Sequence, residues 1–248
     1  MTIQEQLVSF AFDKAYPYIL EQPHIRDYTS GISFILVGSA ATGLCTAGSD
    51  VDVCLVCSRD VYDVISVGTR WLDGRPTEVV LDGIQLHYYA VSTDNLEKKI
   101  AASDGLAMYV YSNALVIDDT AEHYRPILEK IRAALPQRFE CELDMLGRRK
   151  RALRTVLTEN TDPMTRLELC CELAKRLLTC IALFDGLESD TRKRLYRTAL
   201  RGPTGKELQP RVDALLALMG SVCRPENTAA ANEFLATFDL CFERISKR

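Results

Sequence analysis

Residues 37–56 read VGSAATGLCTAGSDVDVCLV and decide how the first half of the chain is interpreted. An apolar run ends at Gly38, a loop of small residues follows, and a second apolar run begins at Asp50. The two runs, GISFILVG (31–38) and VDVCLVC (51–57), are continuous and rich in β-branched residues, which is typical of buried strands. The stretch therefore predicts a strand, a glycine turn, a loop and a second strand.

The turn and the start of the second strand carry the residues on which the chemistry depends. Glycine has no Cβ, so the backbone at Gly38 and the hydroxyl of Ser39 can approach a ligand closely. Side chains alternate along a strand, so Asp50 and Asp52 project on the same side. Such a pair is also common at a solvated strand end, but the preceding strand and glycine turn favour a cation site. Two carboxylates there suit Mg²⁺ that carries a nucleoside triphosphate.

The remaining patterns predict an α+β half followed by a helical half. Asp82-Gly83 separates two strand-like runs and is typical of a β-hairpin turn. From about residue 121 onward, apolar residues recur at helical spacing. We therefore expect a small mixed β-sheet flanked by helices in residues 1–120, and an α-helical bundle domain in residues 121–248. The segments predicted before residue 120 are helices at 2–20 and 95–102 and strands at 31–38, 51–57, 77–81, 84–91 and 113–119.

A family resemblance rests on the same motif. Gly38-Ser39, ten intervening residues and Asp50-Val51-Asp52 resemble the signature of the DNA polymerase β-like nucleotidyltransferase superfamily. Its small bacterial members, including the aminoglycoside nucleotidyltransferases, are the most similar. The resemblance covers residues 30–120, and the helical half resembles the family only in architecture. It implies that the Gly-Ser turn contacts the triphosphate and that the two aspartates bind metal and are catalytic.

Two further residues are candidate nucleotide contacts. Ser49 directly precedes the aspartates, and it either hydrogen-bonds a phosphate or caps the loop. Lys175 lies in LELCCELAKRLLTCIAL, a segment apolar enough to be a core helix, so its cation should emerge at the surface or at the nucleotide. The basic runs at 148–154 and 192–201 offer weaker signals, because such runs are usually solvated helical faces.

Position 87 departs from the family pattern. The family normally has a third carboxylate on a neighbouring strand, and the hairpin places that role at His87. An imidazole can bind a metal or accept a proton at neutral pH, but it cannot supply negative charge. His87 is therefore the catalytic base, a histidine packed on a half-buried strand, or the sign of a site without turnover. Alternatively another acid substitutes, the candidates being Glu78, Asp82, Glu168 and Glu172.

The resemblance implies a metal-dependent nucleotidyltransferase. It would move a nucleoside monophosphate from an NTP, with Mg²⁺ or Mn²⁺ as cofactor, to an acceptor hydroxyl and release pyrophosphate. ATP is the expected substrate on abundance alone, and the acceptor is a small molecule or a protein side chain. The alternative is a degenerate nucleotidyltransferase fold that serves as a nucleotide-binding or partner-binding module.

Composition limits the partners. The net charge of −4 over 248 residues disfavours a protein that coats nucleic acid by bulk charge. The N-terminal apolar stretch contains charged residues, and no run is long enough to span a membrane. Nine cysteines, mostly inside apolar segments, are expected to be reduced and buried in a cytoplasmic protein. The sequence does not indicate an oligomeric state.

Overall fold

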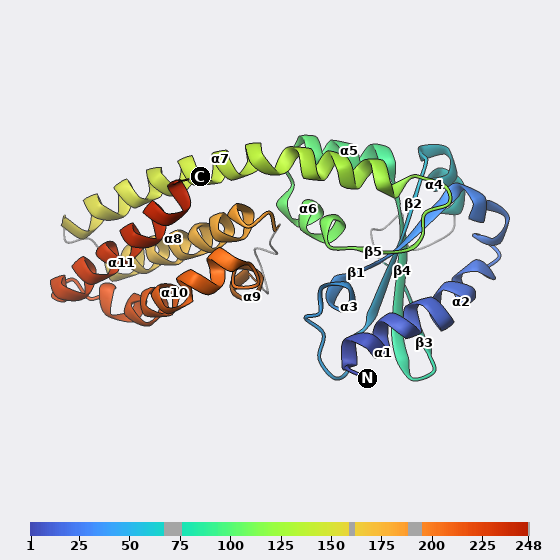
Figure 1. Ribbon diagram of the computed structural model, residues 1–248, viewed down its shortest axis with the longest axis horizontal. Helices are drawn as coiled ribbons and strands as arrows, with labels where there is room; N and C mark the ends of the chain where they lie inside the picture. Colours follow the sequence, from blue (N-terminus) through green and yellow to red (C-terminus); the bar gives the residue numbers. More distant parts are fainter. Residues whose placement is uncertain (67–75, 159–161, 188–194, 248) are drawn as a thin grey trace. The chain divides into compact units, whose positions relative to one another are not determined.

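The computed structural model divides into two compact units, Met1–Ala133 and Ala134–Arg248, each with its own core (Figure 1). The boundary between the units falls inside one long helix, α7 (Tyr124–Thr158). The described residues are 1–66, 76–158, 162–187 and 195–247.

Unit 1 is built on a five-stranded mixed sheet with the strand order β3-β4-β2-β1-β5. β1 runs antiparallel to β2 and β5, whereas β4 runs parallel to β2 and antiparallel to β3. The β3–β4 turn has positive φ at Asp82 and Gly83, as the type I′ hairpin turn requires. The strands are β1 (Ile32–Val37), β2 (Val51–Cys57), β3 (Thr77–Leu81), β4 (Ile84–Ser92) and β5 (Leu115–Asp118).

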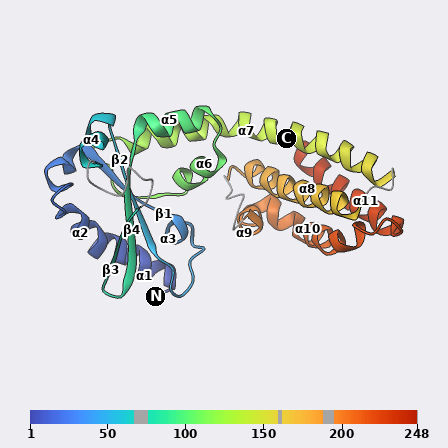
Figure 2. The same cartoon turned by 180° about the vertical axis from the view of Figure 1, so that it is seen from behind.

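The N-terminal helices pack on one face of this sheet (Figure 2). α1 (Ile3–Phe10) continues through a π-helical turn into α2 (Tyr16–Leu20). The π turn lies just before Pro17, whose missing N–H removes the bond to the carbonyl four residues earlier. Apolar residues of these helices, such as Phe10, cover the odd-numbered side chains of β2, such as Val53, and form the first core.

The opposite face is covered over part of its length by α6 (Gly105–Ser112) and the first turn of α7. Tyr111 of α6 lies against Cys54 of β2, and the Tyr124 hydroxyl donates to the Tyr111 carbonyl. Side-chain caps begin most of the remaining helices of unit 1. These helices are α3 (Gly38–Thr42), α4 (Arg59–Ile65, capped by Ser58) and α5 (Thr93–Ala101, capped by Ser92); α6 is capped by Asp104.

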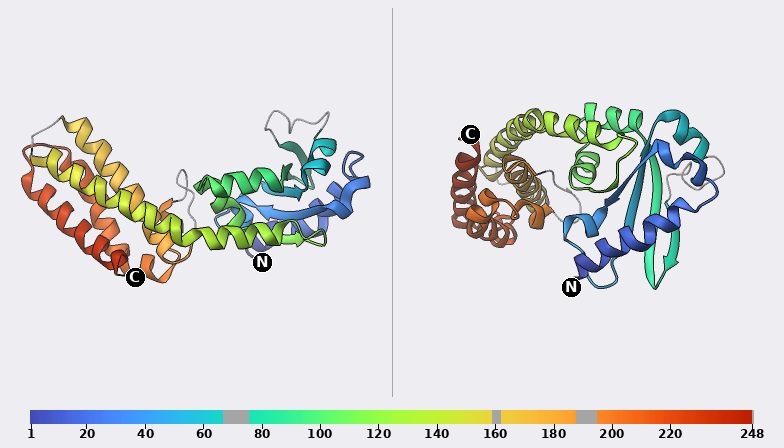
Figure 3. Two further views of the ribbon diagram at one scale, coloured as in Figure 1. Left: turned by 90° about the horizontal axis from the view of Figure 1, so that it is seen from above. Right: turned by 45° about the vertical axis from the view of Figure 1, so that its right-hand side comes forward.

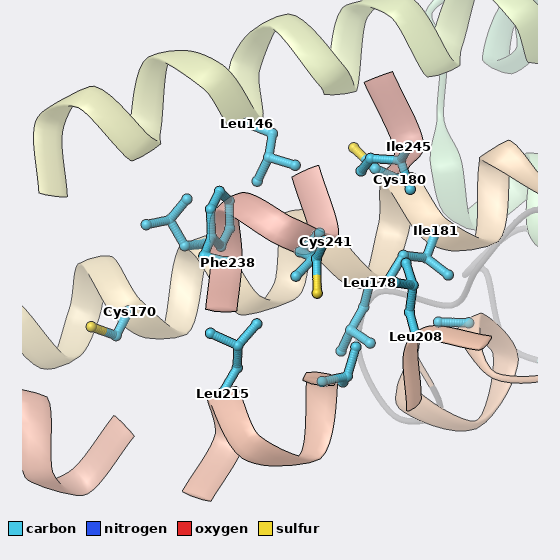
Figure 4. Packing of buried hydrophobic residues seen from close by; sticks show 14 of the residues in the cluster. Leu146, Cys170, Leu178, Cys180, Ile181, Leu208, Leu215, Phe238, Cys241 and Ile245 are labelled. Atoms are coloured by element: carbon cyan, nitrogen blue, oxygen red, sulfur yellow. The ribbon is translucent and has the colours of Figure 1, made fainter. Parts of the chain in front are cut away.

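Unit 2 is a helical bundle whose long helices lie side by side (Figure 3). Its core is continuous and aliphatic, with Phe238 and the thiols of Cys180 and Cys241 buried inside (Figure 4). All nine cysteines of the chain are free. The helices after α7 are α8 (Pro163–Phe184), α9 (Leu195–Ala199), α10 (Pro203–Val222) and α11 (Thr228–Ser246).

The expected fold class is confirmed: a mixed sheet with helices precedes a helical region. One difference is that the helical patterns before and after Pro136 form a single helix, α7. Pro136 is exposed, so water can solvate the carbonyl that its ring deprives of a partner. Phe139 and Leu146, which follow the proline on α7, are both buried in the bundle core and fix the helix on that side of it.

Basic residues of the run at 148–154 form ion pairs with acidic residues of unit 2, as expected for a charged helical face. Residues 192–194 of the second run lie outside the described residues. Among the helices that the structure describes, none has the length and hydropathy to cross a membrane. The ion pairs of the first run are Arg148–Asp144, Arg149–Glu172, Lys150–Asp239 and Arg154–Asp239.

Candidate active site

Sheet pairing brings the three main candidate residues together. Asp52 and His87 are direct register partners on the parallel strands β2 and β4. Asp50 precedes β2 by one residue and projects to the same side as Asp52. One carboxylate oxygen of each aspartate and a ring nitrogen of His87 all lie within 4.8 Å of one another. The alternation of strand side chains therefore builds the cluster that the sequence predicted.

His87 Nδ1 faces both carboxylates. It lies 3.1 Å from Asp50 Oδ2 and 3.3 Å from Asp52 Oδ1, and the His87 side chain is only 16% exposed. His87 Nε2 is buried and has no hydrogen-bond partner among the residues described. These contacts argue against a merely packed histidine, because the ring is oriented by the two aspartates.

Only glycine fits at position 38, because the Asp52 carboxylate lies against its backbone. Its φ is +72°, and a Cβ built at this position would lie 2.3 Å from Asp52 Oδ2. Val37, the last residue of β1, pairs with Asp52 across the antiparallel ladder, which sets this close approach. Glycine therefore makes room for the carboxylate and also adopts a backbone conformation that other residues rarely take.

The turn after Gly38 is held by its own hydrogen bonds. The Thr42 hydroxyl donates to the carbonyls of Gly38 and Ser39, and Ser39 is buried. Ser49 Oγ accepts a hydrogen bond of 2.9 Å from the Thr46 amide, so this serine closes the loop before the aspartates. Contacts of Ser39 and Ser49 with phosphate remain predictions.

The donor set fits a divalent cation. Two carboxylates suit Mg²⁺ or Mn²⁺, and an imidazole nitrogen adds a ligand that the transition metals accept more readily than Mg²⁺. The Asp50 and Asp52 side chains are 40% and 27% exposed, so a hydrated ion carrying a substrate can reach them. The side chains are already gathered, which leaves little reorganisation for binding.

A buried polar cluster behind the site was missed by the sequence analysis. Cys54 and Tyr89 follow Asp52 and His87 by two residues on β2 and β4, and Tyr111 of α6 meets them. Burial raises the pKa of Cys54 to about 12 and the pKa values of both tyrosines well above 10, so all three stay neutral. The cluster therefore lies behind the aspartates on the same sheet face without adding charge. The sequence signal that could have found it is the alternation of strand side chains, which puts Cys54 and Tyr89 on the same sheet face as Asp52 and His87.

The other candidate acids lie outside the cluster. Among the described residues, the metal-ligand group contains neither Glu78 nor Asp82. Glu78 is the register partner of His87 on β3 and is exposed, whereas Asp82 at the hairpin tip lies 3.6 Å from the Lys14 amine. In unit 2, Glu172 forms ion pairs with arginines of α7 and α8. Glu168 is on the same helix.

Lys175 is exposed on α8. Its neighbour Arg176 forms ion pairs with Glu142 and Glu172 within unit 2. A contact between Lys175 and a triphosphate remains a prediction.

The family model for the nucleotidyltransferase domain matches residues 23–109, which include the Gly-Ser turn, both aspartates and His87. The chain carries a nucleotidyltransferase domain. The resemblance to the DNA polymerase β-like superfamily is thereby supported at the level of the domain. Among solved structures, a nucleotidyltransferase-like protein from Exiguobacterium sibiricum aligns with a TM-score of 0.49 at 12% identity, covering 93% of this chain and 74% of that one. No curated protein matches the sequence.

Proposed function

We propose that the protein transfers a nucleoside monophosphate from a metal-bound NTP, with ATP the expected donor, to an acceptor hydroxyl, and releases pyrophosphate. The observation that carries the proposal is the gathering of Asp50, Asp52 and His87 beside Gly38 in a nucleotidyltransferase domain. Asp50 and Asp52 would hold the cation. A bound divalent cation supplies charge neutralisation at the phosphates.

The chain's own residues would position the substrate and accept a proton. In the reaction the acceptor oxygen bonds to the α-phosphorus, the bond to the bridging oxygen breaks, and the hydroxyl proton passes to a base. His87 Nε2 is buried, so Nδ1 is the ring nitrogen that faces the site. Without a cation, Nδ1 is placed to donate its proton to Asp50 and Asp52; it would act as the base only in the tautomer protonated at Nε2, once a bound cation engages the carboxylate oxygens.

A cavity lies next to the loop that leads into Asp50, although α1, which forms part of its wall, packs on the sheet face opposite to Asp52. It has a volume of about 550 Å³ and is lined by α1, the loop at 46–49 and the β3–β4 hairpin. Its lining includes Ser49, which precedes Asp50, and Gln85, which precedes His87 by two residues on the same face of β4.

The decisive experiment is calorimetric titration with ATP, GTP, CTP and UTP, with and without Mg²⁺ or Mn²⁺. An Asp50→Asn/Asp52→Asn variant should lose metal-dependent binding. A matched Asp27→Asn/Asp60→Asn variant, which removes the same charge from two exposed positions of unit 1, should keep it. If the wild-type protein binds no nucleotide, or if the first variant binds as tightly as the second, the proposal is wrong.

A second candidate function follows from His87. A histidine in place of the third acid favours a nucleotide-binding module without turnover, because the site carries one negative charge fewer. The two functions differ in pyrophosphate release. Release from a bound NTP that depends on an added hydroxyl acceptor identifies the enzyme, whereas binding that persists without release across an acceptor screen favours the module.

A further inference from the structure

Unit 2 contains a cavity that the proposed function does not use. It has a volume of about 510 Å³, within the range of small-molecule sites. It is formed where α7 ends and α8 and α11 begin, and these three helix ends lie together in each view (Figures 1 and 3). The residues that matter in its lining are Arg154, Leu157, Arg166, Thr228, Asn232 and Leu235.

Arg166 is the unusual residue of this cavity. It is only 2% exposed, and it forms no ion pair with any carboxylate among the described residues. Its Nη2 donates a hydrogen bond of 3.1 Å to the Leu157 carbonyl, but its Nε is buried without a partner in the described part of the chain. An arginine cannot lose its charge at physiological pH, so among the described residues this buried cation has no carboxylate to compensate it.

The surroundings of Arg166 add positive potential. Arg166 lies in the first turn of the 22-residue helix α8, where the helix dipole disfavours a cation. Thr228 is the first residue of the 19-residue helix α11, so a second helix N-terminus faces the cavity. No acidic side chain belongs to the described lining. The described lining therefore favours an anion, although Asp162 already caps α8 and Arg154 at the rim is paired with Asp239.

Two further groups define what kind of anion fits. Arg154 is half exposed at the rim, where it shares Asp239 with Lys150, and the amide of Asn232 is exposed beside it. Leu157 and Leu235 supply an apolar wall. A ligand with one anionic group and an apolar body fits this arrangement, because the lining has a polar side and an apolar side.

We propose that this cavity is a binding site for a small molecule with a phosphate or carboxylate group on an aromatic or aliphatic body. The anionic group pairs with Arg166 and the N-terminal end of α11, and the apolar part packs against Leu157 and Leu235. The site is independent of the metal site in unit 1.

The test is calorimetric titration of the full chain with phenyl phosphate, benzoate and inorganic phosphate, in EDTA and at constant ionic strength. The neutral analogue benzyl alcohol serves as the uncharged probe. We expect saturable binding of phenyl phosphate or benzoate, weaker binding of inorganic phosphate, and none of benzyl alcohol. Tighter binding of phenyl phosphate indicates a phosphate site, whereas tighter binding of benzoate indicates a carboxylate site.

Variants locate the binding. Arg166→Met should weaken it by about tenfold or more, because a hydrogen-bonded ion pair is lost. Asn232→Trp, an exposed lining position, should block the cavity without disturbing the core. Arg211→Gln, an exposed arginine outside the lining, and Asp50→Asn/Asp52→Asn should leave binding unchanged.

The proposal is overturned if the wild-type chain binds neither aromatic anion, or if binding survives in Asn232→Trp. It is also overturned if binding disappears with the aspartate pair, which would place the ligand in unit 1. If Arg166→Met does not fold, the titrations of the wild type and of Asn232→Trp still test whether the cavity binds an anion. A purely structural Arg166, holding the end of α7 through Leu157, predicts lower stability in the variant and no anion binding in the wild type.

Discussion

Replacing Gly38 by alanine tests whether the glycine turn exists to make room for Asp52. The added Cβ would lie 2.3 Å from Asp52 Oδ2, whereas ordinary van der Waals contact begins at 3.4 Å. The carboxylate must therefore retreat by about 1.1 Å, the difference between these two distances. Asp52 is the end of a side chain, so it can move, but it then leaves its contact with His87 Nδ1.

Two effects of the Gly38→Ala change can be separated by magnitude. The positive φ of +72° costs an alanine about 1–2 kcal/mol in the free energy of unfolding. The displaced carboxylate costs metal affinity and turnover, and a misplacement of about 1 Å in an active site can cost about 100-fold in rate. The first effect is common to any glycine at positive φ, and the second is specific to this position.

The assay is Mn²⁺ binding, followed by electron paramagnetic resonance, together with thermal unfolding. Gly83→Ala is the matched control, because Gly83 has a φ of +79° and no atom within 4 Å of its built Cβ. Both variants should lose similar stability, and only Gly38→Ala should lose Mn²⁺ affinity. If Gly38→Ala binds Mn²⁺ as tightly as Gly83→Ala does, the steric argument for the glycine is refuted.

Three other perturbations follow from single contacts. His87→Asp, which supplies the third carboxylate, should raise Mg²⁺ affinity measured by calorimetry, because negative charge is added beside the two aspartates. Hydrogen bonds, the largest from Thr120, lower the pKa of Asp118 below 3.8, so its stabilisation is present above pH 3.8 and lost as pH falls through the folded-state pKa. Asp118→Asn should therefore lose less stability than wild type on acidification, as followed by urea unfolding. In Gly205→Ala the Cβ would lie 1.8 Å from the Ala199 carbonyl oxygen, so unit 2 should be destabilised by about 3 kcal/mol in thermal unfolding.

Each of these has an outcome that contradicts it. Weaker Mg²⁺ binding in His87→Asp would mean that the imidazole is the better ligand. If the stabilities of Asp118→Asn and of the wild type fall in parallel as the pH is lowered, protonation of Asp118 does not contribute to acid unfolding. Gly220→Ala, in the same helix α10 with open space around its Cβ, should be neutral or stabilising; a loss as large as that of Gly205→Ala would deny the clash.

The motif was predictable because its chemistry is local. Alternation within β2 places Asp50 and Asp52 on one side whatever the rest of the chain does, and the run of residues from 51 to 57 is the strand observed. The Asp82-Gly83 turn likewise fixes the β3–β4 register from two residues. The continuity of α7 across Pro136 was not predictable, because a proline usually ends or kinks a helix, and here its exposed position lets water solvate the freed carbonyl.

The sequence by itself determined the strand–turn–strand motif and the α+β class, whereas the place of His87 at the position of the third carboxylate is what the family resemblance implies. Only the tertiary structure decided that His87 Nδ1 contacts both aspartates, because this needs the parallel pairing of β2 and β4, strands that are separated along the chain. The same holds for the burial of Arg166 away from any carboxylate in the described part of the chain. Its position in the sequence is that of an ordinary helical arginine, and its burial results from packing by α7 and α11, which no local pattern encodes.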